Sequence, residues 1–129
     1  MSGIPSGSGT EVLKNGYIKS NSAWTQLKWD TDSTASGNTS GTVEVPTNCI
    51  VTILSITCCN YNSSSVSFAT RMKDASNEVY IINHNGTNIP AYGTFVFSDK
   101  FVLRPTQRLQ FYNSGASDIF VSYIYQDWS

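Results

Sequence analysis

The sequence predicts an all-β fold, a single antiparallel β-sandwich of jelly-roll-like type with a flexible N-terminal arm. Short runs of alternating apolar and polar residues recur along the chain, which gives each predicted strand one apolar face. Clusters of turn residues separate these runs at intervals of roughly eight to twelve residues, as in sandwiches and barrels. No segment has the helical apolar period of about 3.6 residues. With 129 residues, the chain has room for one domain with one core.

The N-terminal part of the chain predicts an arm, two strands and a loop. Residues 1–10 are rich in Gly and Ser and are predicted to form the flexible arm, so the sandwich domain is expected over residues 11–129. A first strand is expected from Glu11 to Ser20. A second is expected from Ala23 to Trp29, where apolar and polar residues alternate. The segment Asp30–Gly41 has no large apolar residue and is predicted to be an exposed loop.

The middle of the chain contains its most apolar run, Ile50–Cys59. Because this run is rich in β-branched residues, it predicts a strand that is covered on both faces. A short strand from Thr42 to Val45 is expected before it. Pro46 ends that strand, since proline has no N–H to donate to a ladder.

Alternation predicts further strands over residues 66–73 and 78–83, and several more between Thr94 and Tyr125. The segment between them, residues 84–93, is rich in Asn, Gly and Pro and is predicted to be a loop. Asn85–Gly86 indicates a hairpin-type turn within it. In the last third, the alternating residues expected to share the apolar face of their strands are Phe95, Phe97, Leu109, Phe111, Ile119, Val121, Tyr123 and Tyr125.

The surface of this protein is expected to be polar but nearly uncharged. Charged residues make up 13% of the chain, about half of the roughly 25% that is usual in soluble domains, and the net charge is −1. Because Lys and Arg are few and scattered, we expect no binding of nucleic acid or of an anionic membrane. The first residues do not resemble a signal peptide, and no apolar run approaches the roughly 20 residues that span a bilayer. We therefore expect a soluble protein, synthesised in a host cytoplasm, whose surface suits contact with other proteins.

The residue types on which most enzymes and metal sites depend are scarce. Cys49, Cys58 and Cys59 are an odd number, and the last two are neighbours that face opposite sides of a strand, so free thiols are expected. His84 is the sole histidine, which leaves too few residues for a zinc site and a single candidate base for a Ser-His-Asp triad. We expect no metal, no cofactor and no enzymatic activity.

The chain contains more aromatic residues than one small core needs. Tyr and Trp are enriched in protein interfaces, so part of this surplus is predicted to contact neighbouring subunits. The chain ends in YIYQDWS, and a tryptophan at this place is hard to bury within its own sandwich. The residues expected to make subunit or capsid contacts are Ile4 and Pro5 in the arm, together with Trp24, Tyr125 and Trp128.

Five short motifs follow one another over about the last two thirds of the chain. They are Val45-Pro46, then Ser55-Ile56 with Cys59-Asn60, then Ile89-Pro90-Ala91 with Gly93-Thr94, then Phe101-Val102-Leu103 with Leu109, and finally Ser122-Tyr123-Ile124. In this order they resemble the motifs of small β-sandwich structural proteins of tailed bacteriophages. The N-terminal strands and the Asp30–Gly41 loop are not covered by the resemblance.

The resemblance implies a virion component, specifically a decoration (cement) protein on the outside of an icosahedral head. Such proteins commonly form trimers where capsomers meet, so a homotrimer that binds the major capsid protein on the capsid exterior is implied. The implied action is mechanical, because the protein would bridge neighbouring capsid subunits against the pressure of the internal DNA. Many modest contacts suffice for this, since several contacts per copy multiply the effective affinity.

Two other functions are compatible with the same sequence. The fold also suits an adaptor or fibre base at the neck or tail of a virion, and the sequence does not separate these locations. A carbohydrate-binding module is a different class, in which Trp24, Trp29 or Tyr92 would stack on a sugar ring. The abundant asparagines would supply the polar groups that a sugar site needs beside the aromatic ring.

Overall fold

The computed structural model describes residues 10–20, 22, 24–29 and 43–128. Residues 1–9 of the predicted arm and the predicted loop Asp30–Gly41 lie outside this part of the chain. The described residues form nine β-strands and no helix. In chain order the strands are β1 (Thr10–Ser20), β2 (Thr25–Gln26), β3 (Cys49–Asn60), β4 (Val66–Lys73), β5 (Val79–Ile89), β6 (Thr94–Phe97), β7 (Phe101–Leu103), β8 (Arg108–Asn113) and β9 (Ser117–Asp127).

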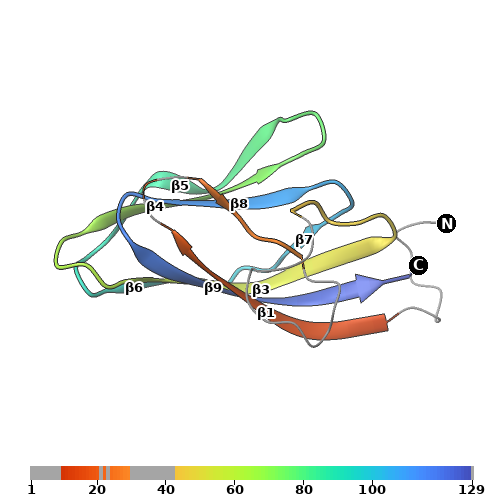
Figure 1. Cartoon of the computed structure of the whole chain (residues 1–129), viewed down its shortest axis with the longest axis horizontal. Helices are drawn as coiled ribbons and strands as arrows, with labels where there is room; N and C mark the ends of the chain where they lie inside the picture. Colours follow the sequence, from red (N-terminus) through yellow and green to blue (C-terminus); the bar gives the residue numbers. More distant parts are fainter. Residues whose placement is uncertain (1–9, 21, 23, 30–42, 129) are drawn as a thin grey trace.

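The strands form two antiparallel sheets that lie one over the other (Figure 1). In the five-stranded sheet the order is β1-β9-β3-β6, and β7 also pairs with β3. β6 pairs with residues 56–59 of β3 and β7 pairs with residues 51–53, so both lie along the same edge of β3. The four-stranded sheet has the order β2-β8-β4-β5. The predicted all-β fold and antiparallel sandwich are confirmed, whereas the jelly-roll connectivity stays a prediction.

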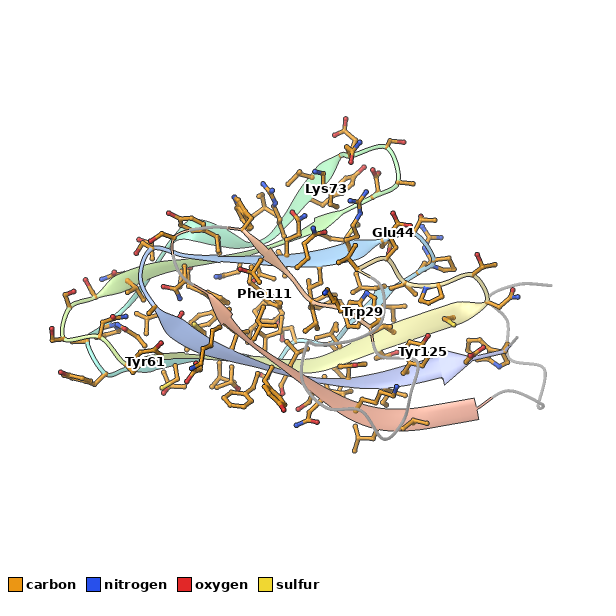
Figure 2. The ribbon with its side chains drawn as sticks, viewed as in Figure 1. Trp29, Glu44, Tyr61, Lys73, Phe111 and Tyr125 are labelled. Atoms are coloured by element: carbon orange, nitrogen blue, oxygen red, sulfur yellow. The ribbon has the colours of Figure 1, made fainter. Side chains whose placement is uncertain are left out.

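The core lies between the sheets and is built from alternate residues of the strands. Every second residue of β9 from Ile119 to Tyr125 is buried, as the alternation in the sequence predicts. Trp29 and Phe111 are fully buried and point into the space between the two sheets (Figure 2). Each large apolar side chain contributes about 1.5–3 kcal/mol when it is fully buried, so this layer is the main source of stability.

The prediction that Ile50–Cys59 is covered on both faces is wrong. Buried residues of β3 alternate with residues of intermediate exposure, because only the inner face of the strand packs against the other sheet. The register of β3 with β9 shifts between Ile53 and Ser55, which marks a β-bulge at Leu54. Its β-branched residues reflect a central place in the sheet, between β9 on one side and β6 and β7 on the other.

The predicted strand Thr42–Val45 is not formed by the described residues of that range. Val45 N donates a hydrogen bond to Gln107 O at 3.0 Å, and Thr106 N donates to Val45 O at 2.9 Å. These bonds attach the segment to the turn between β7 and β8. The two hydrogen bonds satisfy the backbone N–H and C=O of the buried Val45 without pairing it to a neighbouring strand. This explains why the segment needs no strand of its own.

β2 is shorter than the predicted strand Ala23–Trp29, since it covers only Thr25–Gln26 beside β8. The chain nevertheless continues along β8, because Leu27 N donates a hydrogen bond to Leu109 O at 3.1 Å. Leu27 and Trp29 are both buried, in agreement with the alternation of the sequence.

The prediction of a loop over residues 84–93 is wrong for its first half, because β5 continues to Ile89. Thr87 pairs with Phe68 and Asn83 pairs with Thr70, so the three residues 84–86 lie opposite one residue of β4. Thr87 Oγ1 donates to Asn83 Oδ1 at 3.1 Å across the base of this bulge. The Asn85–Gly86 pair therefore lies in a bulge within β5 and not in a hairpin turn. A bulge accepts turn-forming residues as a hairpin turn does.

Asn60, at the end of β3, is fully buried and connects two loops. Its Nδ2 donates to the backbone oxygens of Ser64 at 3.0 Å, Ile89 at 3.2 Å and Pro90 at 2.9 Å. Its Oδ1 accepts from the backbone N and from the Nδ2 of Asn62, both at 2.9 Å. Because the whole amide is used, Asn60 holds the turn after β3 and the connection between β5 and β6 in one arrangement.

Candidate protein-contact surface

The outer face of the five-stranded sheet carries exposed apolar side chains in two rows. Strand register places alternate residues of β1, β9, β3, β6 and β7 next to one another on this face. The first row consists of Leu13, Ile124, Thr52 and Val102. Leu13 is 71% exposed and Val102 is 52% exposed. Contiguous exposed apolar residues of this kind are typical of a surface that binds another macromolecule.

The second apolar row crosses the same sheet four residues further along β1. It consists of Tyr17, Phe120, Thr57 and Val96. The ring centroids of Tyr17 and Phe120 are 6.1 Å apart, so the two rings form one apolar surface. Phe120 is half exposed although its chain neighbours Ile119 and Val121 are fully buried, which shows that it belongs to the outer face.

Between the two apolar rows lies a row of short polar side chains, Asn15, Ser122 and Ser55. Together with Leu54 and Lys100, among others, these residues line a shallow depression of about 610 Å³. Leu13 of the first row and Lys14 also line this depression. Asn and Ser side chains each carry both a hydrogen-bond donor and an acceptor.

Polar pairs close the face at both ends. Lys19 Nζ lies 2.8 Å from Asp118 Oδ1, and this hydrogen bond, together with the charge of the carboxylate, raises the pKa of Lys19. At the other end, Gln126 Nε2 donates to Glu11 Oε2 at 2.7 Å. The charged residues of β1 on this face therefore stand at its two ends and have partners within the chain. We call the three rows and the two end pairs the outer apolar face.

A second apolar surface lies where the two sheets part. The end of the β4–β5 hairpin rises away from the five-stranded sheet (Figure 1). Between the hairpin and the edge of that sheet is a groove of about 270 Å³. We call it the hairpin groove, and its apolar lining comes from Met72, Tyr80 and Ile82 on one side and from Phe97, Phe101, Val102 and Leu103 on the other. The chain thus presents apolar side chains at two parts of its fold.

The residues predicted to make subunit contacts do not gather at one place. Ile4 and Pro5 lie outside the described residues. Tyr125 is only 4% exposed and its hydroxyl donates to Cys49 Sγ at 3.3 Å, so its ring belongs to the core of its own chain. Trp128 is partly buried, and its backbone N donates to Asn48 O at 2.9 Å. Trp24 precedes β2, in the other sheet.

The outer apolar face was missed by the sequence reasoning, which did not name Leu13, Tyr17 or Phe120 as contacts. A signal for them is present in the chain. The run from Ile119 to Tyr125 already supplies a complete core face, so Phe120 and Ile124 are large apolar residues at the positions that should be polar.

The three proposed sugar-stacking residues differ in their exposure. Trp29 is fully buried and is therefore excluded as a stacking platform. Tyr92 is 71% exposed and Trp24 is 37% exposed. Arg71 Cζ lies 3.7 Å from the centroid of the Trp24 ring, and the ring of Tyr112 is 5.5 Å away, so Trp24 is already stacked within the chain.

The cysteines are free, and Cys49 and Cys58 are buried. Burial raises the pKa of Cys58 to about 11 and also raises the pKa of Cys49, so both thiols stay protonated near neutral pH. Within the described ranges, no group of three or more His, Cys, Asp and Glu side chains is placed to hold a metal ion. These thiols therefore serve as small buried side chains.

A search of the described residues for a helix that is long and apolar enough to cross a membrane finds none. No protein-family model matches the chain, and no curated protein matches its sequence. The two apolar surfaces are therefore the observations from which a function is proposed.

Proposed function

We propose that this protein is a non-enzymatic structural protein of a tailed-bacteriophage virion, specifically a decoration protein that bridges neighbouring major capsid subunits on the outside of the head. The observation that carries the proposal is the presence of two apolar surfaces on one small sandwich, the outer apolar face and the hairpin groove, which meet at Val102. A protein that bridges its neighbours needs at least two contact surfaces. The assignment to a phage head rests on the order of the five motifs.

The low charge of the chain supports the same proposal. With 13% charged residues and a net charge of −1, copies of this protein can lie close together without strong mutual repulsion. Its polarity comes from Ser, Thr and Asn, which cost less to desolvate than charged groups when contacts form. Modest contacts at two surfaces act together, because the second contact forms at a high effective concentration once the first exists.

The test is to locate the protein and count its copies in the virion by cryo-electron microscopy and quantitative mass spectrometry. A decoration protein is expected in hundreds of copies on the exterior of the head, following the icosahedral lattice. Absence of the protein from the head would refute the proposal. A count near one ring of subunits, located at the portal end, would assign the protein to the neck or tail instead.

A carbohydrate-binding module is the second candidate, because Trp24 remains 37% exposed although Arg71 lies over its ring. Arg71 lies over the Trp24 ring and its Nε donates to Gln110 Oε1 at 2.7 Å, so polar groups stand beside an exposed aromatic ring. A specific glycan-array signal that is lost in Trp24→Ala and kept in Tyr92→Ala would support this function. If the wild-type protein binds no glycan on the array, the carbohydrate-binding function is rejected.

A further inference from the structure

We propose that the outer apolar face binds the same face of a second copy of this chain, around a twofold axis that runs across the strands above Asn15 and Ser122. The contact goes beyond the proposed function, because it concerns two copies in solution and needs no capsid. It identifies what would cover the exposed apolar side chains of the five-stranded sheet.

The face is arranged symmetrically about its central row. On β1, Leu13 and Tyr17 lie two residues before and after Asn15. On β9, Ile124 and Phe120 lie two residues on either side of Ser122. A twofold axis along the central row therefore places each apolar row of one copy on the other apolar row of its partner. Such a contact is isologous, since each copy uses the same patch.

The charges at the two ends of the face are complementary under the same rotation. Glu11 lies four residues before Asn15 and Lys19 lies four residues after it. The axis brings Lys19 of one copy towards the partner's Glu11, and the reverse pair forms at the other end. Opposite charges meet twice, whereas Lys14, which lines the depression at the central row, would lie near its own copy.

The size of the face agrees with what a weak dimer needs. With strands about 4.8 Å apart and about 3.3 Å per residue, the face measures roughly 20 by 30 Å once the side chains at its edges are included. Each copy would then bury about 600 Å² and the pair about 1,200 Å², which is near the lower end of specific interfaces. We therefore expect a dissociation constant in the micromolar range.

The polar side chains of the central row are expected to make the middle of this interface hydrated. The facing depressions leave space between the copies, and water bound there would bridge Asn15 and Ser122 to their symmetry mates. Lys100 borders the depression at the edge of the sheet and would approach its own copy. Its side chain is exposed, so it can turn towards solvent and away from the axis.

A twofold contact differs from the homotrimer that the sequence resemblance implies. A threefold ring needs a heterologous contact, in which two different patches of the chain meet. The outer apolar face has one apolar row on each side of its central polar row, so a twofold axis along that row brings the patch onto itself. Such a patch suits an isologous contact. Mass measurement separates the two states.

The first experiment is sedimentation equilibrium of the full chain over a concentration series that reaches the high micromolar range. The expected species is twice the chain mass of 14.2 kDa. In Phe120→Lys the dissociation constant should rise about 30-fold or more, as for a central contact residue. Ile81→Lys, which changes a similarly exposed residue on the four-stranded sheet, is the matched control and should leave it unchanged. A monomer at all concentrations, or a trimer, would overturn the proposal.

A second experiment tests the axis through the charges and does not depend on how well Phe120→Lys folds. Lys19→Glu should weaken the dimer, because two glutamates then face each other at each end. Adding Glu11→Lys to the same chain should restore it. If the double variant stays as weak as the single one, the proposed axis is wrong. Both results are measured in solution without capsids, so they test the dimer and leave the presence of the protein on the phage head to its own experiment.

Discussion

Asn60 shows how one residue can hold an end of the sandwich. Its amide satisfies three backbone oxygens and binds Asn62, and none of its surface is exposed. The backbone N of Asn60 also donates to Gly93 O at 2.9 Å. Two of the five sequence motifs, the one ending in Asn60 and the one containing Ile89-Pro90 and Gly93, therefore meet at this contact. Their joint occurrence is explained by the fold.

Replacing Asn60 with alanine should lower the free energy of unfolding by about 2–4 kcal/mol, because the backbone oxygens of Ser64, Ile89 and Pro90 lose their donor at once. The measurement is urea denaturation followed by circular dichroism. Asn88→Ala is the matched control, since Asn88 is exposed on β5 and its replacement should cost less than about 0.5 kcal/mol. Equal stabilities of the two variants would show that the Asn60 amide does not hold the loops.

Cys58 should make the stability of the protein depend on pH in alkaline solution. Burial raises the pKa of this thiol from 9.0 to about 11 in the folded chain. The unfolded thiol therefore ionises first, so the free energy of unfolding is unaffected by Cys58 below about pH 9 and falls as the pH rises towards 11.

The measurement is the urea midpoint of the wild type and of Cys58→Ser between pH 7 and 10.5, where the range is set by the pKa values of about 9 and 11. Serine keeps an acceptor for Asn113 Nδ2, which lies 3.2 Å from the sulfur, but it does not titrate in this range. The wild type should lose more stability than the variant as the pH rises. Parallel pH curves would contradict this role of Cys58.

At the scale of the strands, Gly16 allows β1 to pack under the segment that follows β2. A Cβ atom at this position would stand 2.9 Å from Leu27 Cδ1 and 3.6 Å from Leu27 Cγ. Gly16 is buried and pairs with Val121, so its missing side chain faces the core. The space left by the missing side chain of Gly16 is thus occupied by the Leu27 side chain, from the segment after β2.

Gly16→Val should destabilise the protein by about 1–3 kcal/mol, because the added atoms overlap the Leu27 side chain. The control is Asn15→Val, which places the same side chain one residue away on the exposed face. Thermal unfolding at low protein concentration compares the two variants. A Gly16→Val protein as stable as the wild type would mean that Leu27 moves aside without cost.

The strands show which parts of the fold follow from local sequence. Alternation predicted the buried residues of β9, because a side-chain period of two depends only on the strand itself. The continuation of β5 through Asn85–Gly86 could not be predicted, since turn-forming residues are accepted in a bulge once β4 supplies a partner strand. The one-sided burial of β3 depends in the same way on where the second sheet lies.

At the scale of the whole molecule, the contact residues were harder to predict than the core. Tyr125 was predicted to make a subunit contact and Trp29 to stack on a sugar, yet both side chains are buried in their own chain. The outer apolar face becomes visible only when strand register brings Leu13, Ile124 and Val102 into one row, although they come from three separate strands. An interaction surface on a sheet is assembled by long-range pairing, which alternation along one strand does not reveal.

The proposed bridging of capsid subunits can be tested directly on capsids that lack this protein. Purified protein is added, the particles are sedimented, and the temperature at which they release DNA is compared with that of untreated particles. We expect the protein to sediment with the capsids and to raise the temperature at which they release DNA. Capsids that bind none of the protein and release their DNA at an unchanged temperature would contradict it.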